Sequence, residues 1–266
     1  ILNLIYITWH FLGMLVYYIY SSLKKPYIGG YYCSDQNRFR KVHKMIRLSL
    51  EYFLKNNNYK NEDLNILEIG TCAGGSTLQI CNYLKKKNIN NFKIYCLDHW
   101  KKFIANRQEK SWNFHEYILN KGLDNGKIFN IFKNNINFSG FQNNVRIIVD
   151  SSEESLKKIS NIKFDFIYID GGHSYPVVTS DIKMCIPLLK NQGIICGDDY
   201  EIIYDHCDQK KIMKDVLDVK QEFCLENKTQ KPYHPGVTLA VKDFFGSIPS
   251  HNGFWAQMKI NDKFTN

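Results

Sequence analysis

The sequence lacks the short cysteine patterns that mark zinc ribbons and redox dithiols. None of its eight cysteines forms a C-x-x-C pair, so neither kind of site is indicated. No internal repeat is visible along the 266 residues. Several cysteines lie within apolar runs, where a free thiol behaves as a small hydrophobic group. We therefore expect a reducing compartment, the cytoplasm, for this chain.

Formally charged side chains are absent from residues 1–23. The length of this segment is close to that of a bilayer span, but Asn3, His10 and Gly13 weaken that interpretation. Two alternatives stay open: a membrane anchor or signal anchor, and a helix packed on the domain or on a partner subunit. A membrane and a second copy of the chain are accordingly both candidate partners of this segment.

A single basic stripe is also missing, although the formal net charge is +9 and the pI is near 9.0. Lys and Asn recur together in short runs that are scattered over the whole chain. This pattern is typical of a solvated basic surface, so a nucleic-acid partner is not expected. With 266 residues and 44% hydrophobic content, the chain can bury one substantial core, which indicates one domain or at most two.

Hydrophobic periodicity divides the chain into helices and short strands. Residues 37–54 have apolar side chains at helical spacing, and from Leu64 onward short apolar runs ending in Gly or Asp alternate with helical stretches. This alternation predicts an α/β fold with a mostly parallel sheet covered on both faces, which binds ligands at the carboxyl ends of its strands. The expected strands are 64–69, 93–97, 145–149, 164–169, 193–196 and 254–260, and the expected helices are 76–86, 127–138, 153–159, 176–189 and 237–245.

The first expected strand runs into a glycine-rich loop, ILEIGTCAGGST over residues 66–77. Its spacing, Gly70-x-x-x-Gly74, differs from the G-x-G-x-x-G of dinucleotide folds, which disfavours a nicotinamide oxidoreductase. Glycines allow the backbone to approach a ligand, and the following helix presents free N–H groups. Glu68, at the strand end, suits a ligand with an ammonium and a sulfonium better than one with phosphates. An ordinary strand-to-helix turn is the alternative.

Polar residues also follow the next two expected strands. Asp98 ends the second strand, where a carboxylate can accept both hydroxyls of a ribose. After the third strand, Ser151 or Ser152 can reach an adenine edge or cap the next helix, since S/T-x-x-E suits a helix start. Binding and capping are equally good interpretations of these serines.

The last two parallel strands bring three carboxylates, Asp170, Asp198 and Asp199, to one rim of the sheet. Like charges brought together are mutually destabilising unless a cation or shared protons compensate. A hard divalent ion that prefers oxygen ligands, Mg²⁺ or alternatively Mn²⁺, is the simplest compensation. The alternative is that one Asp caps a helix and another faces water. His173, three residues after Asp170, stands where a general base would serve.

Several motifs in this order resemble those of class I S-adenosylmethionine-dependent methyltransferases of the macrocin and mycinamicin sugar O-methyltransferase type, a group that includes cephalosporin-hydroxylase-like proteins. The resemblance runs from about Leu64 to Ile260. The matching motifs are LEIG-x-x-x-G-x-ST, Asp98-x-Trp100, the block from Val145 to Ser151, I-D-G-x-H-x-Y, G-D-D-Y, and His234-Pro-Gly-Val-x-x-Ala-Val-x-x-Phe-Phe.

The resemblance implies a Rossmann-like fold: a mostly parallel, doubly wound sheet with an antiparallel C-terminal strand, preceded by N-terminal helices. It implies a magnesium site at Asp170, Asp198 and Asp199, and a base at His173. Catechol O-methyltransferase is similar but has Asn where this chain has Asp199. Together with the apolar leader and the helical periodicity that precede it, the resemblance leads us to expect a leader helix (1–25), a helical cap (26–62) and the methyltransferase domain (63–266). The implied S-adenosylmethionine contacts are Glu68, Gly70, Gly74, Ser76, Asp98, Ser151 and Asp170.

We therefore expect metal-assisted O-methylation of a hydroxyl on a sugar or another small molecule. The segments 101–126 and 201–233, where related enzymes build their substrate pocket, match nothing we recognise, so the acceptor is not readable. A non-catalytic scaffold that keeps the fold is one alternative. A methyltransferase acting on a macromolecule is another, although the chain has neither N/D-P-P-Y/F after the fourth strand nor a Pro-Cys nucleophile.

Overall fold

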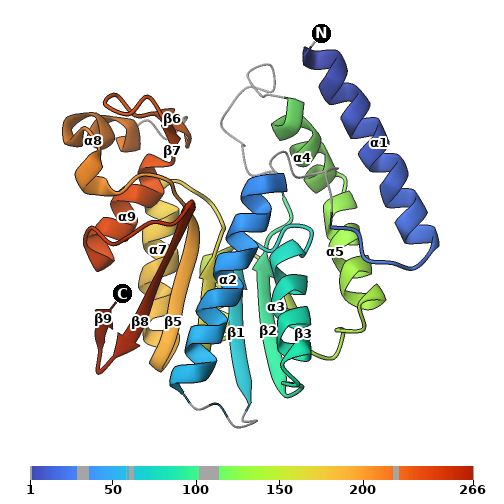
Figure 1. The fold of residues 1–266 in the computed structure, drawn as a ribbon, viewed down its shortest axis with the longest axis horizontal. Helices are drawn as coiled ribbons and strands as arrows, with labels where there is room; N and C mark the ends of the chain where they lie inside the picture. Colours follow the sequence, from blue (N-terminus) through green and yellow to red (C-terminus); the bar gives the residue numbers. More distant parts are fainter. Residues whose placement is uncertain are drawn as a thin grey trace.

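The computed structural model describes residues 2–28, 36–57, 59, 63–101, 114–217 and 222–265. A seven-stranded sheet in the order β3-β2-β1-β4-β5-β8-β9 forms its centre (Figure 1). Strands β1 to β5 are parallel, β8 runs antiparallel to β5, and β9 runs antiparallel to β8. The strands are β1 (Leu64–Ile69), β2 (Phe92–Asp98), β3 (Val145–Val149), β4 (Phe164–Ile169), β5 (Leu189–Tyr200), β8 (Gly253–Ile260) and β9 (Lys263–Thr265). The expected fold class is confirmed.

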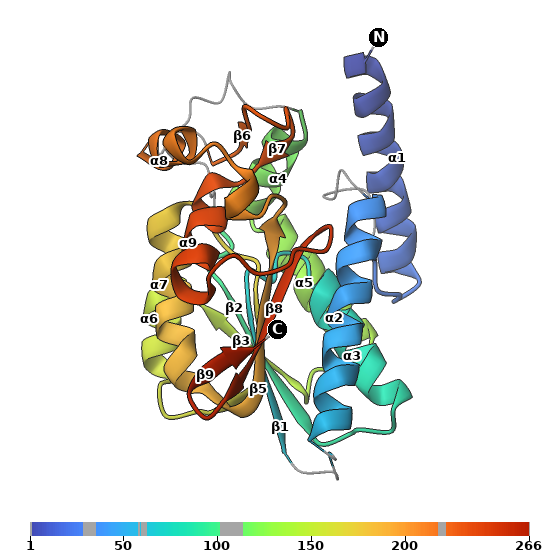
Figure 2. The same cartoon turned by 60° about the vertical axis from the view of Figure 1, so that its left-hand side comes forward.

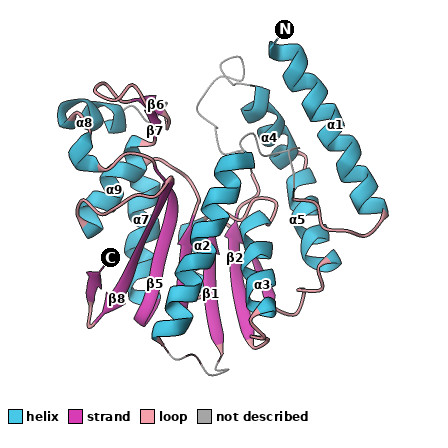
Figure 3. Cartoon of the chain, viewed as in Figure 1, coloured by secondary structure: helices cyan, strands magenta, loops and turns pink. Residues whose placement is uncertain are grey.

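Helices cover both faces of the sheet, as Figure 2 shows most directly. One face carries α2 (Gln36–Asn56), α3 (Gly75–Lys86) and α5 (Lys127–Phe138), and the other carries α6 (Ser152–Lys158), α7 (Tyr175–Cys185) and α9 (Pro235–Phe245). The remaining elements are α1 (Leu2–Ser22), α4 (Phe114–Asp124), α8 (Gln209–Leu217), β6 (Cys224–Leu225) and β7 (Pro232–Tyr233) (Figure 3).

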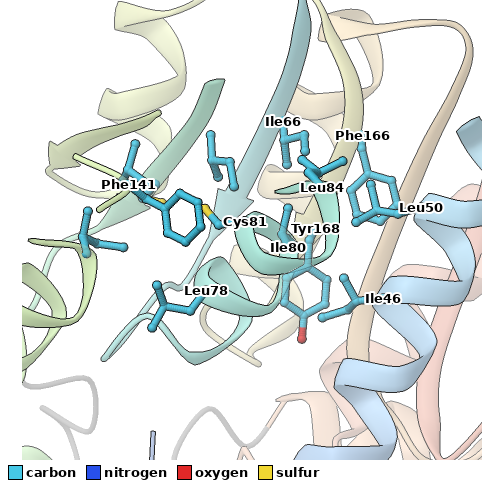
Figure 4. Close-up of a cluster of buried hydrophobic side chains, with 14 of the residues drawn as sticks. Ile46, Leu50, Ile66, Leu78, Ile80, Cys81, Leu84, Phe141, Phe166 and Tyr168 are labelled. Atoms are coloured by element: carbon cyan, nitrogen blue, oxygen red, sulfur yellow. The ribbon is translucent and has the colours of Figure 1, made fainter. Parts of the chain in front are cut away.

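Strand periodicity separates two cores. Every residue of β4 is buried, and from Phe166 to Ile169 its side chains alternate between the faces. Phe166 and Tyr168 join the core under α2 and α3, whereas Ile167 and Ile169 join the core under α6, α7 and α9. Figure 4 shows the first core, where Ile46 of α2 lies near Tyr168. This burial on both faces explains why β4 reads as a continuous apolar run.

The main differences from the expected elements lie near prolines and in unrecognised segments. Helix α7 ends at Cys185, and a 3₁₀ turn over Ile186–Leu188 replaces its expected last turn. Pro187 lies in this turn and has no N–H to continue a helix. Helices α4 and α8 fall in the two segments where no element was expected. The described cysteines are free thiols, and Cys33 lies outside the described residues.

Helix α1 (Leu2–Ser22) occupies the uncharged N-terminal segment, and most of its described side chains are exposed or half-buried. Within its described side chains, Tyr17 is buried, while Phe11 and Leu15 are 59% and 56% exposed. The Tyr17 ring packs edge-on against Tyr27, with 5.6 Å between the ring centroids. Among the described residues, no helix has both the length and the hydrophobicity required to cross a membrane.

Asn135 of α5 joins three segments of the chain. Its amide group donates hydrogen bonds to the carbonyls of Tyr27 (2.9 Å) and Ala73 (2.8 Å), and its Oδ1 accepts one from the Tyr27 N–H (2.6 Å). The side chain is 1% exposed, so these groups would lose buried partners without it.

We expect Asn135→Ala to lower the free energy of unfolding by about 2–4 kcal/mol, because two carbonyls and one N–H lose buried hydrogen bonds. Urea denaturation measures the change. Asn137→Ala is the control, since Asn137 is exposed on the same helix and should change stability by less than about 0.5 kcal/mol. Equal effects of the two substitutions would refute the bridging role.

Candidate functional site

A cavity of about 640 Å³ opens at the carboxyl ends of the parallel strands. This volume is in the range of small-molecule and cofactor sites. Helices α2 and α4 contribute an apolar part of its wall through Phe39, Val42 and Leu123. Of the residues expected at a site, Gly70, Ser76, Asp98, Ser151, Asp170, His173, Asp198 and Asp199 line the cavity. Glu68 and Gly74 do not.

The glycine loop has the backbone geometry that only glycine accommodates well. Gly70 has φ +84°, and a Cβ at this position would lie 1.9 Å from the carbonyl oxygen of Asp170. Gly74 has φ +83°, and a Cβ there would lie 2.8 Å from the ring of Phe132. Gly70 thus lets the loop touch the end of β4, and Gly74 lets α3 begin against α5.

Glu68 lies beneath the loop and holds the first turn of α3. Its carboxylate accepts hydrogen bonds from the hydroxyls of Ser76 and Thr77, the latter at 2.6 Å, and it is fully buried. Burial raises the pKa of Glu68 to about 7, and the nearby carboxylates of Asp170 and Asp98 raise it slightly further. The hydrogen bonds from the two hydroxyls lower this pKa, but by less than burial raises it. This geometry differs from the direct cofactor contact expected for Glu68, because its oxygens are directed to α3.

Asp98 connects the end of β2 to the glycine loop. Its Oδ2 accepts a hydrogen bond from the Cys72 N–H (2.9 Å) and its Oδ1 accepts one from the Trp100 N–H (2.7 Å). The indole of Trp100 in turn donates to the Cys72 carbonyl at 2.7 Å. A carboxylate offers about four acceptor positions, so these two bonds leave capacity for two ligand hydroxyls.

Ser151 caps α6, as one of its two interpretations predicted. Its hydroxyl accepts a hydrogen bond from the Glu154 N–H at 3.3 Å, so the capping interpretation is confirmed. Ser151 and its neighbours Asp150 and Ser152 also line the cavity. The cap therefore fixes the position of this wall without removing it from reach of a ligand.

Asp170, Asp198 and Asp199 form the carboxylate cluster. Oxygens of the three side chains lie within 4.8 Å of one another. Consecutive strand residues normally point to opposite faces, but Asp199 has φ +63° and the pairing of β5 with β8 shifts register between Gly197 and Tyr200. This irregularity brings two adjacent carboxylates to one edge. Three hard oxygen donors so close together suit Mg²⁺ or Mn²⁺.

His173 lies between two carboxylates. Its Nε2 is 2.9 Å from Asp199 Oδ2, and its Nδ1 is 3.5 Å from Glu222 Oε2. Burial disfavours the charged imidazolium, but the two carboxylates outweigh burial and raise the pKa of His173 well above its usual value. The ring therefore carries a proton over a wide pH range unless the negative charge beside it is compensated.

His234, which the sequence offered only as part of a matching motif, belongs to a second group on the same rim. Its ring centroid lies 4.5 Å from that of His173, and its Nδ1 is 2.9 Å from Glu201 Oε1. A Cβ on Gly236 would lie 2.3 Å from the His173 carbonyl oxygen, so glycine permits α9 to start against this turn. The motif His234-Pro-Gly indicated a close backbone contact at Gly236, but the sequence did not show that the contacted segment is the turn at His173.

His43 is a further cavity residue that the sequence did not single out. It lies on α2 and is 4% exposed. Burial, with a smaller contribution from Arg47, lowers the pKa of His43 to about 4. Its imidazole is therefore neutral near pH 7, and this wall of the cavity is uncharged. The helical spacing of residues 37–54 predicted the helix but gave no indication that it bordered a site.

Comparisons with known proteins place residues 67–200, half of the chain, in the family described as a methyltransferase domain. An uncharacterized protein of Acanthamoeba polyphaga mimivirus is 27% identical over 149 residues, which are 54% of this chain and 55% of that protein. The chain thus spans about half the length of this curated relative.

Two solved structures are also similar. A candidate caffeoyl-CoA O-methyltransferase from Staphylococcus aureus is 16% identical, with a TM-score of 0.49 and coverage of 93% of this chain and 91% of that one. An O-methyltransferase from Bacillus cereus in complex with SAH is 16% identical, with a TM-score of 0.44 and coverage of 81% of this chain and 70% of that one.

The buried carboxyl of Glu68 should make stability depend on pH. Between about pH 4.5 and pH 7 the unfolded chain releases a proton that folded Glu68 retains, so the contribution of Glu68 to the free energy of unfolding falls as pH rises, by about 3 kcal/mol in total. His43, whose pKa is lowered, contributes in the opposite direction in both the wild type and the variant. We expect Glu68→Gln to remove this fall, measured by urea denaturation across that range. Glu153→Gln, at an exposed position, is the control. An unchanged slope in Glu68→Gln would refute the raised pKa.

Proposed function

Because this chain belongs to the methyltransferase-domain family, we propose that it transfers the methyl group of S-adenosylmethionine to a hydroxyl oxygen of a small molecule. The observation that carries the proposal is the continuity of one cavity. The same cavity of about 640 Å³ is lined by the glycine loop and Asp98 at one part and by the carboxylate cluster and His173 at another. A methyl donor and an acceptor held in it would meet in the same cavity.

The cofactor would lie along the ends of β1, β2 and β3. Gly70 and Ser76 would face its methionine part, Asp98 would accept the ribose hydroxyls, and Ser151 would border the adenine. Supporting this placement are the cavity-lining positions of these residues and the remaining acceptor capacity of the Asp98 carboxylate. Glu68 and Gly74 would act indirectly, by fixing the first turn of α3.

The carboxylate cluster would hold a divalent cation, Mg²⁺ or Mn²⁺, next to the acceptor. A bound cation supplies positive charge that lowers the pKa of an acceptor hydroxyl. His173 would take the hydroxyl proton while the oxygen attacks the methyl carbon and the carbon–sulfur bond breaks, which leaves S-adenosylhomocysteine and a methyl ether. The acceptor would be a sugar or a related hydroxyl compound, as the resemblance to macrocin-type enzymes suggests.

Calorimetry with S-adenosylmethionine, with and without Mg²⁺, tests the cofactor assignment. We expect Asp98→Asn to weaken binding at least tenfold, about 1.4 kcal/mol, because the amide loses one acceptor oxygen and the negative charge. Asp124→Asn, on the exposed end of α4, should bind like the wild type. Absence of binding by the wild type would favour a non-catalytic scaffold, and binding with no effect of Asp98→Asn would reject the ribose contact.

His173 is tested by methyl transfer measured over a panel of sugars, phenols and glycosylated compounds. We expect the rate to rise with pH until the His173 ring has lost its proton, because a general base acts only in its unprotonated form. His173→Ala should lose at least 100-fold in turnover and should lose the pH dependence, while its affinity for S-adenosylmethionine stays within about threefold. Loss of cofactor affinity without a change of the pH profile would contradict the role as base.

A further inference from the structure

A second set of metal-ligand side chains adjoins the carboxylate cluster and shares Asp199 with it. His173, Asp199 and His234, here the histidine cluster, each offer one donor atom, and these atoms lie within 4.8 Å of one another. His173 Nε2 is 2.9 Å from Asp199 Oδ2, and His234 Nδ1 is 3.5 Å from Asp199 Oδ1. Donors around a tetrahedral zinc ion, bound at about 2.0–2.1 Å, lie roughly 3.3 Å apart. The two observed separations end on different oxygens of Asp199 and lie on either side of that value.

The donor chemistry differs between the two clusters. Imidazole nitrogen suits zinc, copper, iron and nickel, whereas carboxylate oxygen suits magnesium, calcium and manganese. Two imidazoles and one carboxylate therefore select a borderline transition-metal ion. The carboxylate cluster has oxygen donors alone, so it favours magnesium or manganese over such an ion.

Two further carboxylates lie next to the imidazoles. Glu222 Oε2 is 3.5 Å from His173 Nδ1, the nitrogen that does not face Asp199 Oδ2. A carboxylate on the non-ligating nitrogen fixes the orientation and tautomer of a metal-ligating ring. Glu201 Oε1 is 2.9 Å from His234 Nδ1, the same nitrogen that faces Asp199, so Glu201 is a candidate fourth donor. Its Oε2 accepts a hydrogen bond from the His234 backbone N–H at 3.2 Å.

The backbone holds the three side chains in place. Asp199 occupies its position through a left-handed backbone conformation, with φ +63°. The close approach of Gly236 to the His173 carbonyl fixes the start of α9, which follows His234 directly. Asp199 and His234 are 5% and 9% exposed. A cation would therefore meet donors that are already assembled.

We propose that the histidine cluster binds one divalent transition-metal ion, with Zn²⁺ as the representative, at a position separate from the carboxylate cluster. Bound there, the ion occupies the His173 nitrogen that faces Asp199. On the proposed function, which this consequence alone rests on, the ion removes the proton acceptor, so Zn²⁺ inhibits methyl transfer even when Mg²⁺ is in excess.

Cobalt(II) is the probe, because its visible absorption reports nitrogen ligands directly and needs no enzymatic turnover. The full chain is titrated with Co²⁺ in the presence of millimolar Mg²⁺, and Zn²⁺ is then added. We expect one equivalent of Co²⁺ to bind, with a visible band that Zn²⁺ abolishes. His173→Ala and His234→Ala should each weaken Co²⁺ binding at least tenfold. His251→Ala, at an exposed histidine, and Asp198→Asn, in the carboxylate cluster, should each keep it.

Three results would overturn the proposal: no Co²⁺ band, a band that survives both histidine substitutions, or a band that Mg²⁺ displaces and Asp198→Asn removes. The last result would mean a single cation position on the carboxylates. Circular dichroism spectra confirm that each variant is folded before titration. Calorimetry with S-adenosylmethionine distinguishes failure of the metal-site proposal from failure of the proposed function. Cofactor binding without a Co²⁺ band rejects only the metal site at the histidine cluster. A Co²⁺ band without cofactor binding rejects the methyltransferase proposal.

Discussion

Repulsion among carboxylates at the ends of β4 and β5 is the constraint around which the site is organised. The parallel register pairs Ile169 with Gly197, so Asp170 and Asp198 leave the sheet side by side. The left-handed conformation of Asp199 then adds a third negative charge at the same edge. Such crowding is tolerable only where positive charge is supplied. His173 can supply such charge, and the contact of Gly236 with the His173 carbonyl holds this histidine in position.

Protonated imidazole is one source of positive charge on this rim, as the contact of His173 with Asp199 shows. The divalent cation that we propose would be another, and it would reduce the tendency of the neighbouring imidazole to hold a proton. Proton and cation would then compete for the same negative charge. The protonation of His173 and the binding of a cation to the carboxylates would depend on each other.

Close contacts join the part of the cavity lined by the glycine loop to this rim. Gly70 contacts the carbonyl of Asp170 so closely that no side chain would fit between them. Asp98 ties the same loop to the end of β2 through two backbone N–H groups. Glu68 secures the first turn of α3 from below. Because these contacts are between backbone segments or buried groups, the two halves of the cavity have little freedom to move apart.

The sequence by itself determined the parallel sheet, since short apolar runs ending in Gly or Asp and alternating with helical periodicity need no distant information. It also located Asp98 and Asp170, because a polar residue at the end of a parallel strand must lie at the ligand-binding edge. Only the tertiary structure decided that Glu68 is turned toward α3 and that His234 meets His173. It also revealed the left-handed backbone conformation by which Asp199 reaches the rim where the sequence placed it. Those outcomes depend on a bulge and on close contacts between segments far apart in the chain, which no local pattern encodes.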